Sequence, residues 1–440
     1  MSLGNEKEVS DKKFPGSCTR SQRFRRLFKE GFWIVLGQAM SVVGSLIGVR
    51  LLTELLAPAA YGELALGMTV ATLVNQAVLG PLSNGVMRFY APAVEQDDFG
   101  GYLNAVKCLV LSATGVTVIL ILTMVVGLLI AGQTKMIGIA IAAFIFAILS
   151  GYNSILSGIQ NAARQRAIVA LHQGMESWAR FLVAAGLLMC LSATSTMAIV
   201  GYAVAAILVL GSQYVFFKRI VPKGVTGQDK KEDWQKEMWN FSWPISIFGM
   251  FTWLQLASDR WALNLCSTVE DVGLYAVVFL LGYYPMSIAT GMVMQFFAPI
   301  FYKRAGDAND SLRTANVNRL SYCLAGLALA VTICAFLLSY IFHTKIFKLF
   351  VAKEFASVSN LLPWMLLAGG VFTAGQSISL NLQSQMKTRV MMAPKIITAL
   401  LGVFLNFIGA YLYGTSGVVM AGVLFSASYF LWMVVLSKHK

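Results

Sequence analysis

The chain has 440 residues, of which 57% are hydrophobic and only 12% are charged, and its formal net charge is +14. A water-soluble domain carries about a quarter charged residues, so this composition excludes an ordinary soluble protein and indicates one that lies in lipid. The six cysteines have no paired spacing and the three histidines are scattered, so we expect neither a disulfide framework nor a metal site. The basic residues are spread over the connections between apolar segments, which indicates membrane topology and not nucleic-acid binding.

Residues 1–31 are polar and contain no long apolar run, so we predict a cytoplasmic N-terminal tail. Twelve apolar segments of roughly 20 residues follow, the length that crosses a hydrocarbon core. The predicted spans are residues 32–52, 64–87, 106–131, 136–157, 167–190, 196–217, 241–265, 272–298, 320–342, 361–382, 391–412 and 416–436. The fold class that follows is an all-α polytopic membrane protein.

The lysines and arginines predict the orientation of these spans. Of the 34 Lys and Arg, 27 fall on the side of the tail and four on the other, and the rest lie within spans. Positive residues favour the cytoplasmic side, so both termini are expected in the cytoplasm. A charged connection at residues 218–240 separates predicted six-span bundles at 32–217 and 241–436, and residues 437–440 form the cytoplasmic C-terminus.

An internal repeat supports this division. Gly62 and Ala65 align with Gly273 and Ala276 at an offset of 211 residues. A second match, at an offset of 223, pairs Gln160, Arg164, Arg166, Ala170 and Gly186 with Gln383, Lys387, Arg389, Ala393 and Gly409. Because each half contains an even number of spans, both halves start on the same side and form parallel repeats, with a central cavity between two six-helix bundles.

Three short motifs resemble those of a known family. The run Leu56-Ala-Pro58-Ala-Ala-Tyr61-Gly62 resembles the turn that ends the first span of Wzx-type polysaccharide and O-antigen flippases. Ser258-Asp259-Arg260 and Gly273-Leu-Tyr275-Ala276 together resemble the seventh and eighth spans of that family. Leu405-Asn406 and Tyr413-Gly414 resemble the turn between its last two spans. These flippases belong to the multidrug/oligosaccharidyl-lipid/polysaccharide exporter superfamily, and the resemblance extends from about Phe32 to Leu436.

The resemblance implies a flippase in the bacterial inner membrane that moves undecaprenyl-pyrophosphate-linked oligosaccharide units from the cytoplasmic to the periplasmic leaflet. Such a protein serves lipopolysaccharide, O-antigen or exopolysaccharide biosynthesis, has membrane lipid around it and works beside polysaccharide polymerase machinery. Short external connections and the lack of a G-x-x-x-x-G-K-[ST] motif argue against an enzyme or a nucleotide cofactor. Energy is then expected from an H+ or Na+ gradient, the membrane potential or product withdrawal.

The span at 167–190 carries His172, Glu176 and Arg180 at positions i, i+4 and i+8. This spacing places all three on one helix face, and charges at membrane depth usually face a bundle interior or an aqueous cavity. We predict that His172 and Arg180 attract pyrophosphate or an acidic sugar, and that Glu176 is an ion-coupling site. The alternative is a Glu176–Arg180 pair that only ties helices together.

Arg50 lies in the first span, and Asp259 and Arg260 lie in the matching span of the second half, one register apart from Arg50. Guanidinium suits phosphate because it never deprotonates and offers a planar fork of donors. We predict that both arginines bind substrate and that Asp259 is a second ion-coupling site. Snorkelling of the arginines to the external interface is the alternative.

Two further cations lie near the cytoplasmic ends of spans. The repeat pairs Lys395 with His172, and Arg88 ends the second span. We predict that both contribute to a basic vestibule in which the diphosphate docks. The alternative is that each is an ordinary basic residue on the cytoplasmic side, with no binding role.

Amide and aromatic side chains within spans, such as Gln76, Gln255, Gln376, Trp253 and Tyr283, can bind sugar hydroxyls and sugar faces, or simply join helices. The runner-up function is a cation-coupled multidrug exporter of the same superfamily, which predicts an interior rich in carboxylates. Within the spans, three arginines against two carboxylates favour an anionic cargo.

Overall fold

A computed structural model of the chain describes residues 20–219, 233–305, 311–385 and 388–438. These residues form long helices, and no strand occurs among them. The first half contains α1 (Arg20–Leu55), α2 (Pro58–Val74), the π-helical η1 (Asn75–Leu79), α3 (Gly80–Glu95), α4 (Phe99–Ile130), α5 (Lys135–Ala162), α6 (Arg166–Cys190) and α7 (Ser195–Lys218). The second half contains α8 (Trp234–Cys266), α9 (Val269–Ala305), α10 (Ser311–Phe350), the 3-10 helix η2 (Lys353–Leu361), α11 (Leu362–Ser384) and α12 (Thr388–Lys438).

The described helices account for twelve crossings of a membrane. Nine helical stretches in this part of the chain are long and apolar enough to span it, with α2, η1 and α3 together forming one of them. The helices α6 and α8 have the required length but carry charged residues. Gly414, with φ of 53°, interrupts α12 and divides it into two crossings. The predicted all-α polytopic fold with about twelve spans is therefore confirmed.

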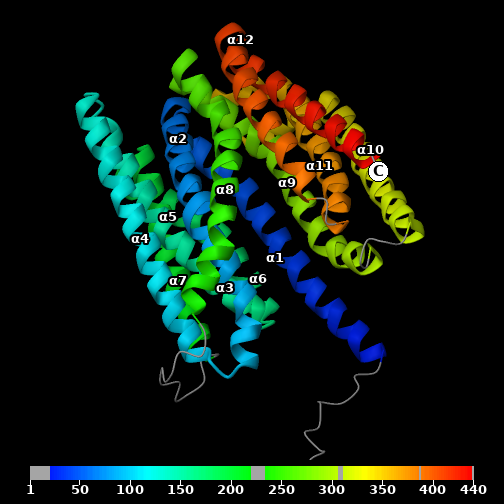
Figure 1. Cartoon of the computed structure of the whole chain (residues 1–440). Helices are drawn as coiled ribbons and strands as arrows, with labels where there is room; N and C mark the ends of the chain where they lie inside the picture. Colours follow the sequence, from blue (N-terminus) through cyan, green and yellow to red (C-terminus); the bar gives the residue numbers. More distant parts are fainter. Residues whose placement is uncertain (1–19, 220–232, 306–310, 386–387, 439–440) are drawn as a thin grey trace, which may run out of the picture.

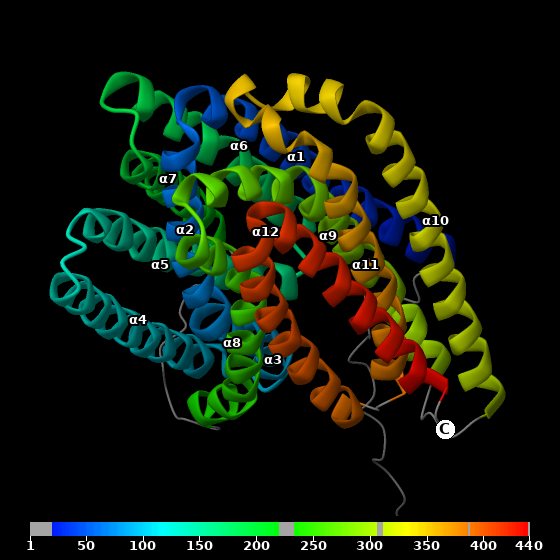
Figure 2. The same cartoon turned by 90° about the horizontal axis from the view of Figure 1, so that it is seen from above.

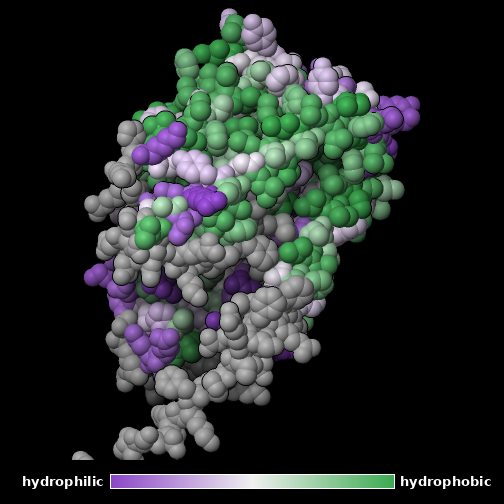
Figure 3. Space-filling view, turned by 90° about the vertical axis from the view of Figure 1, so that its right-hand side faces the viewer, coloured by the Kyte–Doolittle hydropathy of each residue, from purple (hydrophilic) through white to green (hydrophobic). Residues whose placement is uncertain are grey.

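Helices on the periphery expose the apolar surface that lipid requires. On α4, Leu111, Ile119 and Leu122 are 70%, 63% and 60% exposed, and on α10, Leu327 is 62% exposed. Figure 3 shows a surface that is mostly hydrophobic over its upper and right-hand parts, with hydrophilic side chains gathered mainly at the left-hand and lower parts. Exposed apolar area of this extent fits contact with hydrocarbon, since soluble monomers rarely expose such patches.

The two halves repeat one packing scheme. In the first half α1 packs on α6 and α5 packs on α7, and in the second half α8 packs on α12 and α11 packs on α12. Figures 1 and 2 show α4, α5 and α7 on one side of the molecule and α10, α11 and α12 on the other. The halves meet through α2 with α9 and through α3 with α8. Two repeated helical bundles thus form the molecule.

The contact between α2 and α9 is symmetric, because each helix places a glycine against the backbone at the start of the other. A Cβ added to Gly62 would lie 2.0 Å from the carbonyl oxygen of Val269, and one added to Gly273 would lie 2.0 Å from that of Pro58. Pro58 and Val269 share the same 211-residue offset as the two glycines. Repeat-equivalent residues therefore contact each other in the manner of a two-fold symmetric interface.

We call the end of the molecule at which α1 ends and α2 begins the distal end, and the opposite end the proximal end. At the distal end the two halves are joined by several contacts beside the glycine pair. The backbone N–H of Ala352 donates to the Thr53 hydroxyl at 3.2 Å, and Tyr61 packs edge-on against Phe355. The distal end is therefore closed between the halves.

At the proximal end, α8 packs against α3 of the first half. Asp98 caps α4 by accepting a hydrogen bond from the backbone N–H of Gly101. Its carboxylate also accepts a hydrogen bond of 2.7 Å from the indole N–H of Trp234. Deeper in the bundle, a Cβ on Gly249 would lie 1.9 Å from the Gln76 carbonyl oxygen, so α8 runs directly against the π-helical segment.

Helix ends differ from several predicted span limits. The helix α1 begins at Arg20, inside the predicted tail, and α8 begins at Trp234, inside the predicted connection. Residues 1–19, 220–232 and 439–440, which belong to the predicted tail, connection and C-terminus, lie outside the described residues. The division at residues 218–240 stays a prediction.

Candidate functional site

A central cavity of about 420 Å³ lies between the two halves. The first half contributes residues of α1, α2, η1, α6 and α7 to its walls, and the second half contributes residues of α8 and α9. Arg180 and Arg260 both line it. Among the described residues that form its walls there is no aspartate or glutamate. The cavity therefore presents two guanidinium groups to whatever enters it.

Arg180 reaches the cavity from α6. Its guanidinium carbon lies 4.7 Å from the centre of the Phe181 ring and 5.2 Å from that of Tyr202. Its Nε is buried and makes no hydrogen bond among the described residues. Aromatic faces stabilise a cation without using its N–H donors, so Arg180 is positioned while keeping donors for an anion.

Arg260 reaches the same cavity from α8 and is held more tightly. Its Nη1 donates to the Leu256 carbonyl oxygen at 3.0 Å and to Asp259 Oδ1 at 3.0 Å. The guanidinium carbon also lies 4.5 Å from the centre of the Phe279 ring. Asp259 accepts a second hydrogen bond, of 2.7 Å, from the hydroxyl of Tyr275. Asp259 therefore orients Arg260 and does not itself line the central cavity.

Tyr61 lines the same cavity as the two arginines and is 3% exposed. The next residue is Gly62, at the contact between the halves. The turn motif at the start of α2 thus combines a helix-initiating Pro58, an aromatic wall residue and a glycine that permits close packing.

Polar and aromatic side chains complete the cavity. Gln76 lies in the π-helical η1. Pro81, just after this segment, has no N–H to donate and so disfavours a regular α-helix here. Such π-helical segments are frequent at functional sites. The Trp253 indole N–H donates to the Thr69 carbonyl oxygen at 2.7 Å. Phe279 and Tyr283 stack with ring centres 4.9 Å apart. Aromatic surface of this kind suits the apolar faces of sugar rings.

Arg50 lies at the distal end, outside the walls of the central cavity. Its Nη1 donates to the carbonyl oxygens of Lys348 and Val351 at the end of α10, and its guanidinium pairs with Glu54. Arg50 therefore joins α1 to the second half where the distal end is closed.

His172 and Glu176 share α6 with Arg180 but occupy different surroundings. His172 is 2% exposed, and its ring nitrogens bond the Ile168 carbonyl oxygen at 2.8 Å and the Ser212 hydroxyl at 3.1 Å. Both nitrogens are thereby satisfied at the packing of α6 on α7. Glu176 lies near Arg180 but forms no ion pair with it within the described structure.

The two remaining predicted cations also lie apart from the central cavity. Lys395 lines a separate cavity inside the second half, and Arg88 is exposed midway along α3. The structure therefore brings Arg180 and Arg260 together and places the other predicted residues elsewhere.

Sequence reasoning assigned no role to Phe181, Tyr202 or Phe279, whose rings lie against the two guanidinium groups. Phe181 directly follows Arg180, and Phe279 belongs to an aromatic-rich stretch of α9. Tyr61 was visible within the turn motif, but the motif did not reveal that it lines the cavity.

The fold is shared with several solved transporters. The lipid II flippase MurJ in an inward closed conformation is 13% identical over 93% of this chain and 87% of that chain, with a TM-score of 0.71. An inward-facing multidrug resistance transporter of the MATE family has a TM-score of 0.62, 14% identity and coverage of 91% and 94%. A MOP superfamily transporter from Pyrococcus furiosus, whose binding pocket is described as having reverse polarity, has a TM-score of 0.56, 15% identity and coverage of 94% and 95%. A comparison with curated proteins finds no match.

Repeated helical bundles around an arginine-lined cavity give this membrane protein the fold of these solved transporters. Residues 27–304, more than half of the chain, match the family model described as polysaccharide biosynthesis protein. The chain belongs to this polysaccharide biosynthesis protein family.

Proposed function

We propose that the protein translocates undecaprenyl-pyrophosphate-linked oligosaccharide units from the cytoplasmic to the periplasmic leaflet of the bacterial inner membrane, for O-antigen or exopolysaccharide synthesis. Membership of the polysaccharide biosynthesis family supports a glycan cargo. The observation that carries the proposal is the central cavity, in which two arginines and no described carboxylate face the space between the halves.

A pyrophosphate headgroup loses its hydration when it leaves water, which is costly unless other charges compensate. Arg180 and Arg260 supply fixed positive charge, and their aromatic contacts hold them in place. Guanidinium groups offer planar pairs of donors that match phosphate oxygens. The rings of Trp253, Phe279 and Tyr283 provide surface for the sugars, while the polyprenyl chain remains in lipid.

The contacts that close the distal end support an alternating-access mechanism. The excess of Lys and Arg on the side of the N-terminus supports a cytoplasmic location of the proximal end. The cargo would then enter from the cytoplasmic side past the contacts of α8 with the first half, and translocation would require the contacts at Gly62, Gly273 and Arg50 to separate. The released glycan is then available to periplasmic polymerase machinery.

Coupling to H+ or Na+ is assigned to Glu176, a carboxylate beside Arg180 that is not tied to it. Asp259 is bound to Arg260 and Tyr275, so we propose that it acts on the cargo indirectly, through the position of Arg260. A cation-coupled multidrug exporter would instead need carboxylates on the walls of the central cavity.

The test is glycan export in a strain that lacks the chromosomal copy. Arg180→Gln and Arg260→Gln each remove donors and a charge, so surface polysaccharide is expected to fall by about tenfold or more at equal membrane abundance. Arg219→Gln is the matched control, because Arg219 also lies over an aromatic ring, at 5.0 Å from Phe216, but is exposed at the end of α7.

Drug susceptibility of the same strains separates the two functions. The flippase predicts unchanged susceptibility in the Arg180→Gln and Arg260→Gln strains. Normal surface glycan together with increased sensitivity to cationic drugs would establish the exporter instead.

A further inference from the structure

A second cavity, of about 100 Å³, lies inside the second half between α8, α11 and α12. Its walls contain Phe248, Gln255, Gln376, Lys395 and Tyr429. It is separate from the central cavity, and none of the described residues lining it is an aspartate or glutamate. The lysine is therefore the charged group on its walls.

Lys395 has no counter-charge in this cavity. Its ammonium nitrogen lies 5.3 Å from the centre of the Phe248 ring, and no hydrogen bond or ion pair joins it to another described residue. A smaller neighbouring cavity shares Gln255 and includes Asp259, but that carboxylate is already bound to Arg260 and Tyr275. Lys395 is partly buried, and an ammonium that loses part of its hydration is stabilised by an opposite charge, so the unpaired lysine suits an anion.

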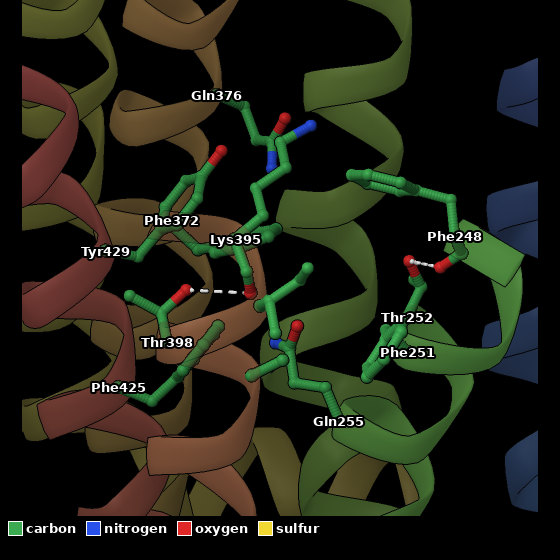
Figure 4. Close-up of a pocket in the computed structure, with 12 residues that line it drawn as sticks. Phe248, Phe251, Thr252, Gln255, Phe372, Gln376, Lys395, Thr398, Phe425 and Tyr429 are labelled. Carbon is green, nitrogen blue, oxygen red and sulfur yellow. Dashed lines mark hydrogen bonds between the residues drawn. The ribbon is translucent and has the colours of Figure 1, made fainter. Parts of the chain in front are cut away.

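Other hydrogen-bond donors converge on the lysine. Figure 4 shows the Tyr429 hydroxyl, the Gln376 amide and the Lys395 ammonium directed to the same part of the cavity, from α11 and both segments of α12. The Tyr429 side chain is 2% exposed, and its hydroxyl, which has Ser379 as a polar neighbour, makes no hydrogen bond of regular geometry among the described residues. An ammonium, an amide and a phenol supply donors of the kind that bind an anion.

The repeat provides an internal comparison. Lys395 is equivalent to His172 at the 223-residue offset. In the first half the position is filled by a buried histidine whose two nitrogens are both bonded within the bundle. In the second half the equivalent position faces a cavity with its charge unpaired. The difference between two similar bundles indicates that the lysine serves a purpose other than helix packing.

We propose that this cavity is a binding site for a small monovalent anion of about the size of chloride or formate, held by Lys395, Gln376 and Tyr429. Its volume accommodates an ion of this size. The site is distinct from the proposed cargo cavity and does not depend on the identity of the cargo. Its occupation links α11 to both segments of α12 and so stiffens the second half.

The test measures thermal unfolding of the purified full-length protein in detergent, with sodium formate or chloride titrated against sodium gluconate at constant sodium concentration. A ligand that binds only the folded state raises its stability in a saturable way. Formate and chloride are expected to raise the midpoint temperature relative to gluconate. Lys395→Gln is expected to abolish this rise, and Gln376→Leu to increase the half-saturating concentration by about tenfold.

Lys345→Gln is the matched control, because Lys345 also lies 5.3 Å from an aromatic ring, that of Phe342, but is exposed. It should retain the response, as should Arg260→Gln, which separates this site from the proposed cargo site. An equal response to gluconate and formate in the unaltered protein, or a full formate response in Lys395→Gln, would overturn the proposal.

Discussion

Arg180 and Arg260 are held by contacts of different strength. Arg180 rests on aromatic rings alone, while Arg260 also bonds a carboxylate and a backbone carbonyl. A guanidinium that rests on rings keeps its N–H groups for a ligand and can move with it. Arg180 is therefore the better candidate for following the cargo during translocation, and Arg260 for fixing its first position.

The ion pair of Asp259 and Arg260 predicts coupled effects on stability. The two side chains are 7% and 13% exposed, so removing either charge leaves the other poorly compensated. Asp259→Asn and Arg260→Gln are each expected to lower the free energy of unfolding by about 1–3 kcal/mol. The double variant should lose less than the sum of the two, as measured by thermal unfolding in detergent. Strict additivity would show that the pair contributes no coupling.

Residue spacing predicted which charges lie in α6 but not where each one points. Positions four apart drift by about 40° around a helix, so His172 and Arg180 differ by about 80°. This drift turns His172 towards α7 while Arg180 reaches the cavity. Arg50 and Arg260 are one residue away from equivalent positions in the repeat, and one residue turns a side chain by about 100° around a helix. The two arginines therefore point in different directions. Only the packing of neighbouring helices selects the face that meets the cavity.

At the scale of elements, the contact between α2 and α9 is the part most sensitive to added volume. Gly62→Ala would place a Cβ against the backbone of α9, which cannot move aside as a side chain can. We expect this variant to weaken closure of the distal end and to reduce glycan export several-fold, by roughly the cost of overpacking. Export at normal membrane abundance is the measurement.

Gly186→Ala is the control for this substitution. Gly186 also lies within a helix, but a Cβ there has no atom within 4 Å. The change should leave export intact, since alanine favours a helix over glycine. If both variants export normally, close approach of the halves at Gly62 is not needed for transport.

Hydropathy predicted the existence of the helices better than their limits. The span at 64–87 belongs to a helical stretch from Pro58 to Glu95, and α10 begins at Ser311, before the predicted 320. The helices α4 and α8 also begin before their predicted spans, directly after the capping residues Asp98 and Asp233. Hydropathy does not record these caps. The π segment needs Pro81 and the packing of α8, which no local pattern conveys.

At the scale of the whole molecule, twelve crossings predict that both termini lie on the cytoplasmic side. Single cysteines at Glu95 and Gln133, both exposed and at opposite ends of α4, test this with a thiol reagent that does not cross membranes. In intact spheroplasts of a variant without native cysteines, Gln133→Cys should react and Glu95→Cys should react only after the membrane is opened. The reverse pattern would invert the proposed direction of transport.

The sequence also predicted the repeat, and with it the general arrangement of the cavity. Matching residues at a constant offset identify equivalent helices, and an even number of spans fixes their relative direction. The offset could not reveal which surfaces join the halves, because that depends on shape. The glycines Gly62 and Gly273 were aligned by sequence, yet only the structure shows that they contact each other's helices.

That reciprocal contact has a consequence for the origin of the chain. A homodimer requires a surface that pairs with its own copy across a two-fold axis. Two copies of a half with six crossings would insert in the same orientation and so could pair in this way. A six-helix ancestor bearing one such glycine would have assembled with a second molecule of itself. Fusion of two such copies would let each half diverge, as in the pairing of His172 with Lys395 at equivalent positions.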